Sequence, residues 1–173
     1  MNIEDVIQKF TGYEIWLQEK ETGVKKKVKR RSLWIRVDRD KIRDAISLLK
    51  EIDKYPHFSI ISASDEGNEI EINYHFALGY GGMLEEFPVS FKVAIPKNDL
   101  KIRSITDLIP AAIFSEREIR EMMGVEFEGL PDKRHLFLTK DFPDGIYPWR
   151  RDEMGIKETN KLYETWKEVK NEV

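Results

Sequence analysis

The chain has 173 residues, of which 40% are hydrophobic and 35% charged, and its formal net charge is −3. This length suits one domain, and a chain so close to neutral has no overall field that would recruit nucleic acid or an anionic membrane. Because cysteine is absent, disulfides, thiolate catalysis and cysteine-ligated Fe–S or zinc sites are excluded within this chain.

The N-terminus "MNIEDVIQKF" lacks the basic and apolar regions of a signal peptide. No apolar run approaches the roughly eighteen residues that a membrane-spanning helix needs. We therefore expect a soluble, cytoplasmic protein. Lys and Glu dominate the charged residues while only two Gln occur, a balance that is typical of thermophile proteins.

The first elements are a short helix and a hairpin. Apolar side chains at helical spacing predict an amphipathic helix at residues 2–10. Alternating apolar residues then predict two strands, at 13–18 and 32–37, joined through a turn at "KETG", residues 20–23. The basic run "KKKVKRR" at 25–31 lies in or beside this hairpin. We interpret it as edge-strand lysines that discourage unwanted pairing, with a nucleic-acid-binding arm as the alternative.

A packed helix and three more strands follow. Residues 38–53 place an apolar stripe behind an Asp cap, which predicts a helix. Strands are predicted at 57–63, 69–78 and 87–96, the last two joined through "GYGGMLEE". The order α-β-β-α-β-β-β predicts an α+β domain with helices on one face of a mixed, largely antiparallel sheet.

The C-terminal part combines a helix with a long aperiodic segment. A helix is predicted at 110–123, ending at Gly124. Residues 125–155 show no period but are rich in aromatic side chains, and loops this long are usually functional or disordered. Their aromatic content argues against disorder. We predict an α+β domain at 1–124 and an extended partner-binding tail at 125–173, which ends in a terminal helix.

Enzyme sites of common kinds are not evident. His57, His75 and His135 have no second ligand at metal-binding spacing. No serine lies in a nucleophile motif. The carboxylates and arginines of residues 115–135 nevertheless leave open a stand-alone enzyme that uses this region, as the alternative to a surface for another protein.

One stretch resembles a known family. "EREIREMMGVEFEGLPDKRHLFL", followed by "YPWRRD", is similar to the signature of the 30 kDa subunit of respiratory complex I, the NADH-quinone oxidoreductase. Arg120 and Glu121 replace the usual Tyr-Asp of that signature, Met123 replaces Phe, and Trp149 replaces Leu. The positions that match are Glu116, Arg117, Glu118, Met122, Gly124, Phe127, Gly129, Pro131, Asp132, Arg134, Pro148, Arg150 and Asp152.

The resemblance implies a non-catalytic peripheral-arm subunit of a membrane-bound oxidoreductase. Because of the departures from the signature, the chain looks more like the corresponding subunit of an energy-converting NiFe hydrogenase or of a related archaeal-type complex. It implies no cofactor in this chain; the NiFe or quinone site and the Fe–S clusters belong to partner subunits. The implied partners are the large hydrogenase-like, 49 kDa-type subunit and the small Fe–S subunit, on the cytoplasmic side of the membrane. The expected interface residues are Glu116, Arg117, Glu118, Phe127, Asp132, Arg134, Tyr147, Trp149, Arg150, Arg151 and Asp152.

Overall fold

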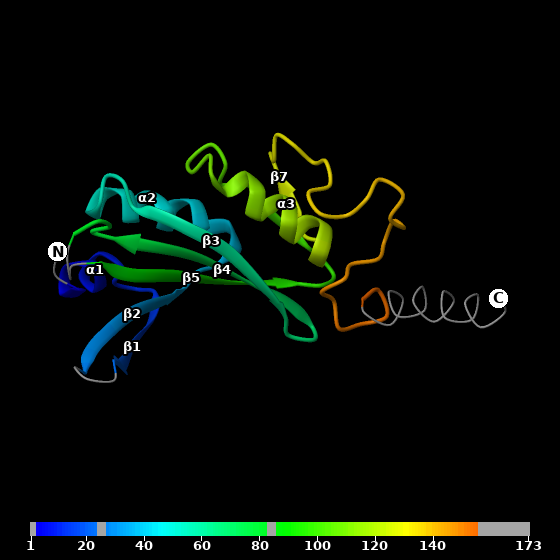
Figure 1. Ribbon diagram of the computed structural model, residues 1–173. Helices are drawn as coiled ribbons and strands as arrows, with labels where there is room; N and C mark the ends of the chain where they lie inside the picture. The colour runs from blue at the N-terminus through cyan, green and yellow to red at the C-terminus, as the bar shows by residue number, and fades with distance from the viewer. Residues whose placement is uncertain (1–2, 24–26, 83–85, 156–173) are drawn as a thin grey trace.

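The computed structural model describes residues 3–23, 27–82 and 86–155 (Figure 1). The chain opens with the predicted helix, α1 (Ile3–Lys9), and the predicted hairpin of β1 (Glu14–Thr22) and β2 (Val28–Arg36). The turn predicted at residues 20–23 is wrong for most of its length, because β1 continues through Thr22, which pairs with Val28. The predicted terminal helix lies outside the described residues.

The middle of the chain follows its hydrophobic pattern. A 3₁₀ turn (Arg39–Lys41) leads into α2 (Ile42–Ile52), whose apolar stripe is buried. Asp38 precedes the 3₁₀ turn as expected, but its side chain makes no capping hydrogen bond. The three predicted strands are confirmed as β3 (His57–Asp65), β4 (Glu69–Leu78) and β5 (Phe87–Pro96).

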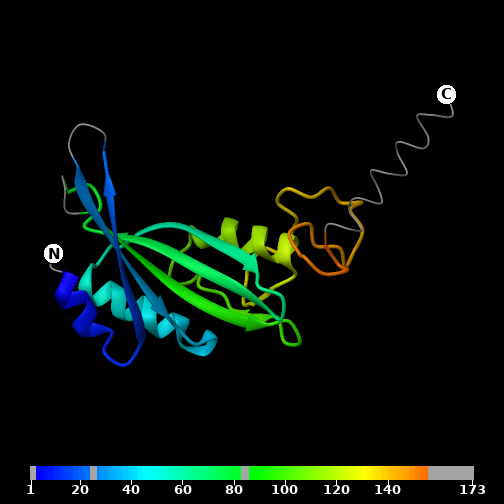
Figure 2. The same cartoon turned by 90° about the horizontal axis from the view of Figure 1, so that it is seen from below.

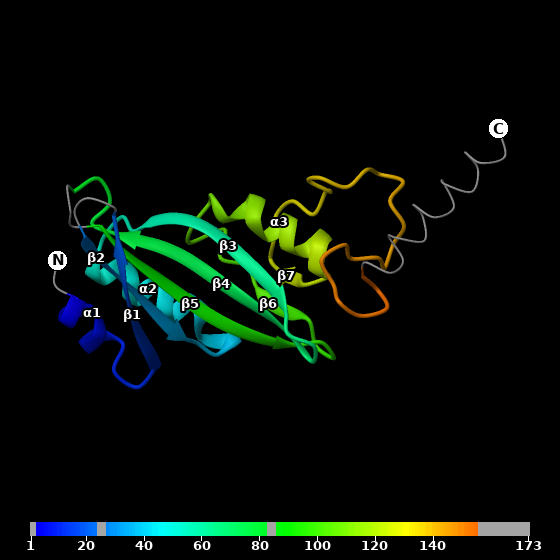
Figure 3. The same ribbon diagram turned by 60° about the horizontal axis from the view of Figure 1, so that its bottom comes forward.

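These strands form one five-stranded sheet in the order β1-β2-β5-β4-β3 (Figure 3). Neighbours are antiparallel except for β2 and β5, which run parallel and pair only at residues 33–36 of β2. The predicted mixed, largely antiparallel sheet is therefore confirmed. The short β2–β5 pairing also leaves the outer half of the β1–β2 hairpin beyond the rest of the sheet.

The hydrophobic core lies against one face of the sheet. Alternate residues of β4 and β5, such as Tyr74 and Phe91, are fully buried there. Phe10, which directly follows α1, packs its ring against Phe91 at 5.5 Å between centroids, and the buried stripe of α2 belongs to the same apolar cluster. The other face carries side chains that are more polar and more exposed, because alternate residues of a strand point to opposite faces.

A β-α-β unit completes the fold. β6 (Lys101–Arg103) and β7 (Glu126–Glu128) form a parallel pair, and α3 (Ala112–Met123) connects them. The predicted helix is confirmed, although it begins at Ala112 rather than at residue 110. Neither β6 nor β7 was predicted. From residue 129 to residue 155 the chain is irregular, and we call these residues the tail segment. Within the described ranges, no helix is both long and apolar enough to cross a membrane.

Candidate functional site

The tail segment folds back on α3 at the end of the molecule opposite the β1–β2 hairpin (Figures 1 and 2). α3 ends at Gly124, whose φ of 78° lies in the left-handed region that glycine tolerates. A Cβ atom there would lie 2.7 Å from the ring of Tyr147. Glycine is therefore required twice at this position: for the backbone conformation, and for the close approach of the tail segment.

The tail segment occupies the C-terminal end of α3. The Trp149 N–H donates to the carbonyl of Met122 at 3.1 Å, and Nη1 of Arg150 donates to the carbonyl of Met123 at 3.3 Å. A helix leaves its last carbonyls without helical partners and carries partial negative charge at that end. The arginine and the N–H group thus satisfy carbonyl groups that would otherwise need water.

Side chains of α3 hold the first half of the tail segment by its backbone. Both oxygens of the buried Glu121 accept backbone N–H groups, from Leu136 and Phe137, each at 2.8 Å. Arg117 donates to the carbonyl oxygens of Arg134 and His135 at 3.0 and 2.9 Å. A carboxylate and a guanidinium therefore fix the path of residues 134–137 by charge-assisted bonds.

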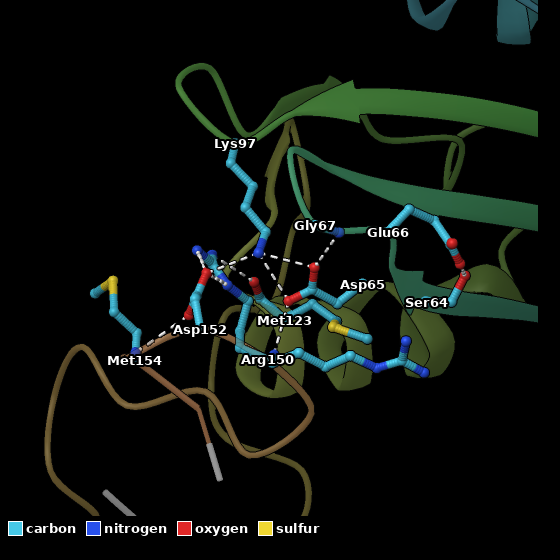
Figure 4. Close-up of polar contacts among 10 residues, drawn as sticks. Ser64, Asp65, Glu66, Gly67, Lys97, Met123, Arg150, Asp152 and Met154 are labelled. Atoms are coloured by element: carbon cyan, nitrogen blue, oxygen red, sulfur yellow. Dashed lines mark hydrogen bonds and ion pairs between the residues drawn. The ribbon is translucent and has the colours of Figure 1, made fainter. Parts of the chain in front are cut away.

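A polar network holds the second half (Figure 4). Nζ of Lys97 lies 2.8 Å from a carboxylate oxygen of Asp65 and 2.8 Å from one of Asp152. Asp65, whose side chain is fully buried, also accepts the backbone N–H of Arg151 at 2.7 Å. Arg150 binds Asp152 through Nε at 2.9 Å. The network joins the ends of β3 and β5 to residues 150–152 of the tail segment.

Electrostatics favour the ionised form of this network. Burial opposes the charge on Asp65, but the bonds from the Arg151 N–H, Lys97 and the Gly67 N–H outweigh it and lower its pKa. Burial likewise opposes ionisation of Asp152, and its bonds to Arg150 and Lys97 hold its pKa far below the usual value. Opposite charges at these distances stabilise one another, so the network is charged at neutral pH.

The expected interface residues fall into three groups: buried, exposed and partly buried. Glu116, Phe127 and Arg150 are buried within this chain. Arg134 has a side chain that is 85% exposed and binds Asp132 at 2.8 Å, and Trp149 and Arg151 are exposed as well. The rest, which are partly buried, are Arg117, Glu118, Asp132, Tyr147 and Asp152. The structure brings most of this set together around α3 and the tail segment.

Several residues of the site were missed from the sequence. Asp65 and Lys97 lie far from the tail in the chain and look like ordinary solvated charges there, so no local pattern marks them. Glu121 stood out only as a departure from the family signature. Among the described residues, no group of three or more His, Asp or Glu side chains is placed to hold a metal ion.

Comparison with known proteins gives a consistent result. The model of the family described as "Respiratory-chain NADH dehydrogenase, 30 Kd subunit" matches residues 35–159. The chain is 39% identical over 132 residues to the membrane-bound hydrogenase subunit beta of Pyrococcus furiosus, covering 75% of this chain and 74% of that one. It is 30% identical to formate hydrogenlyase subunit 5 of Escherichia coli, covering 72% of this chain but 23% of that longer protein.

A solved structure is also similar. A chain of the membrane-bound sulfane sulfur reductase, described as an archaeal respiratory membrane complex, superposes with a TM-score of 0.67 at 26% identity. The match covers 94% of this chain and 89% of that chain.

Proposed function

Because the chain belongs to the family of the 30 kDa subunit of respiratory-chain NADH dehydrogenase, we propose that it is a peripheral subunit of a membrane-bound multisubunit oxidoreductase. Its similarity to a membrane-bound hydrogenase subunit and to a chain of a respiratory membrane complex supports this role. In this role the segment predicted as a partner-binding tail, residues 125–173, docks on a larger subunit of the complex.

The observation that carries the docking proposal is a pair of exposed aromatic side chains on a fixed backbone. Phe137 and Trp149 are 63% and 42% exposed. Their own N–H groups are nevertheless bonded to α3, through Glu121 and the carbonyl of Met122. Binding a partner thus requires little further ordering of the backbone at these two anchors, and such preorganisation lowers the entropic cost of association.

Charged side chains complement these anchors. Arg134 and Arg151 are exposed, and arginine and aromatic residues are enriched among the residues that dominate binding energy at interfaces. We assign them to contacts with carboxylates of the partner. The buried Glu116, Phe127 and Arg150 act differently: they shape the docking surface from within this chain.

The partners proposed are a large hydrogenase-like or 49 kDa-type subunit and a small Fe–S subunit, on the cytoplasmic side of the membrane. The NiFe or quinone site and the Fe–S clusters are assigned to those subunits. The alternative of a stand-alone enzyme at residues 115–135 gains no support from the geometry. Glu116 and Glu121 are buried and accept hydrogen bonds from the chain's own backbone, which engages the carboxylate oxygens that a catalytic acid or base would use.

Truncating the anchors tests the docking surface. Phe137→Ala and Trp149→Ala are each expected to weaken retention of the chain in its membrane complex about tenfold or more, as removal of an interface anchor does. Retention is measured by co-purification from native membranes at increasing salt. Arg134→Ala is expected to lower retention at low salt and to make the remaining retention less sensitive to salt, because it removes an interaction that salt screens.

Tyr55→Ala is the matched control. Tyr55 is 77% exposed and precedes β3, whose opposite end, at Asp65, contacts the tail segment. A strand of this length separates the two ends by roughly 25–30 Å. The control variant is expected to co-purify like the wild type. Wild-type retention of both aromatic variants, with unchanged melting temperatures, would contradict the proposed docking surface.

A further inference from the structure

The β1–β2 hairpin presents two faces of different electrostatic character. On the side continuous with the core, Glu19 pairs with Arg31 at 2.8 Å, and Glu21 lies directly opposite Lys29. Opposite charges placed across an antiparallel pair stabilise it. This side of the hairpin therefore neutralises its own charges.

The opposite side of the β1–β2 hairpin carries positive charges that no carboxylate across the strand pair neutralises. Lys20 lies directly opposite Arg30, both are exposed, and neither side chain forms an ion pair or hydrogen bond with any residue of the described ranges. Like charges directly opposite one another destabilise a strand pair. Without an anion from elsewhere, this cationic pair costs free energy.

Aromatic side chains continue the same side toward the sheet. Trp16 lies directly opposite Trp34, and Trp16 is 41% exposed. The Trp34 ring meets the His75 ring edge-on at 5.7 Å between centroids. His75 is in turn held between the hydroxyl groups of Ser62 and Ser90, at 2.8 and 2.9 Å. Trp34 thus rests on an imidazole ring that two hydroxyl groups hold in place.

The spacing of these pairs defines a binding strip. Trp16 and Lys20 are four residues apart on β1, so the aromatic and cationic pairs are separated by about 13 Å along the strand. Gln18 and Ser32 form the polar pair between them. Because β5 pairs only with residues 33–36 of β2, the cationic end extends beyond the sheet, away from the tail segment (Figure 2).

We infer that this strip binds an acidic, extended segment of a partner protein. The occupant places carboxylates on Lys20 and Arg30 and an apolar side chain on Trp16 and Trp34, about four residues away in an extended conformation. Its carboxylates relieve the repulsion between the two cations, and opposite potentials also orient the encounter.

Charge placement favours a polypeptide over a membrane surface. An anionic membrane that surrounded the hairpin would meet the carboxylates of Glu19 and Glu21, which lie at the same level as Lys20 and Arg30. The tryptophans also lie on the sheet side of the cations rather than beyond them. A segment that follows one side of the hairpin avoids Glu19 and Glu21 and meets only the aromatic, polar and cationic side chains of the strip.

Site-directed photo-crosslinking in the assembled complex tests this inference. A benzoylphenylalanine at Gln18, with a second variant at Ser32, is irradiated in the complex purified from native membranes, and the linked peptides are identified by mass spectrometry. The matched control places the same group at Glu19, on the opposite side. We expect Gln18 and Ser32 to link to an acidic segment of another subunit, and Glu19 not to do so.

Charge reversal then checks the chemistry. Combining Lys20→Glu with Arg30→Glu is expected to lower the yield of that cross-link about tenfold or more, because like charges meet at the site. Lys29→Glu, on the opposite side of the hairpin, is the control. We expect it to leave the cross-link yield from Gln18 and Ser32 close to the yield without charge reversal. The inference is overturned if the strip positions link to phospholipid, to this chain itself or to a segment without an acidic excess, if they link to nothing, or if charge reversal leaves the yield unchanged.

Discussion

Glu116 has an environment unlike that of a surface carboxylate. Its side chain is fully buried, with one oxygen accepting the Ile105 N–H at 2.8 Å and the other accepting the Ser104 hydroxyl at 2.7 Å. Burial raises its pKa from 4.5 to about 7, and the two hydrogen bonds offset that effect only in part. The group therefore holds the loop between β6 and α3 while its own ionisation is unfavourable.

This shift makes stability depend on pH. Between about pH 4.5 and 7 the folded chain keeps a proton on Glu116 that the unfolded chain releases. The contribution of Glu116 to the free energy of unfolding is therefore greatest below pH 4.5 and declines until about pH 7. A change of this size in pKa corresponds to at most about 3 kcal/mol.

Glu116→Gln removes the titration while keeping an acceptor for the Ile105 N–H. We expect the variant to gain stability relative to the wild type as pH rises from 5 to 8, by about 1–3 kcal/mol. Urea denaturation at both pH values measures this difference. Glu128→Gln, at an exposed position on β7, is the control and is expected to show no such change. An equal effect of Glu116→Gln at both pH values would contradict the prediction.

At the scale of elements, the junction of α3 with the tail segment depends on two contacts. The helix ends in a left-handed glycine, and the Tyr147 ring lies 2.7 Å from the position that a Cβ atom of residue 124 would take. Next to it, the Trp149 N–H bonds the carbonyl of Met122. The exposed ring of Trp149 is therefore placed by the end of α3.

Gly124→Ala is expected to disturb this junction. The left-handed conformation costs an alanine about 1–2 kcal/mol, and displacing the Tyr147 ring adds about 1–3 kcal/mol. Thermal unfolding measures the total cost, and hydrogen exchange at the Trp149 N–H reports whether the tail segment has moved.

Gly129→Ala separates the two causes. Gly129 also has a positive φ, of 87°, but a Cβ atom there would have no neighbour within 4 Å. We expect it to show the conformational cost alone, without faster exchange at Trp149. Equal destabilisation by the two substitutions would show that contact with Tyr147 contributes nothing.

The periodic elements could be predicted from the sequence, and the contacts between them could not. Alternation in residues 69–78 and 87–96 marks β4 and β5 because one face of each is buried. β7 is only three residues long, too short to display a period. The predicted interface set lies mostly around α3, yet local pattern could not tell the buried Arg150 from the exposed Arg134, since burial depends on segments distant in the chain.

For the whole molecule, the network of Asp65, Lys97 and Asp152 joins the sheet to the tail segment. Lys97→Met leaves the buried Asp65 without its cation, and breaking such a pair typically costs about 3–5 kcal/mol. We expect faster chymotrypsin cleavage of the tail segment together with lower stability. Lys9→Met is the control, because the Lys9–Glu51 pair is about half exposed and such pairs contribute about 1 kcal/mol or less. Unchanged cleavage of the Lys97 variant would contradict the role of the network.

The same network predicts an acid response. The pKa values of Asp65 and Asp152 are lower in the folded chain than their ordinary values. Their stabilising effect is therefore fully present above about pH 4 and declines as pH falls toward the folded pKa values. Resistance of the tail segment to an acid-active protease is expected to fall below pH 4, and resistance that stays constant to pH 2 would contradict this account.

The partners of the buried Asp65 carboxylate are synthesised at different times. Lys97 follows it by 32 residues, and the Arg151 N–H by 86. A nascent chain can therefore form the sheet and partly neutralise Asp65 well before the ribosome supplies the final donor. Trp149 reaches its place on α3 at about the same moment as that donor arrives. The proposed docking surface is therefore completed only after most of the domain that supports it has been synthesised.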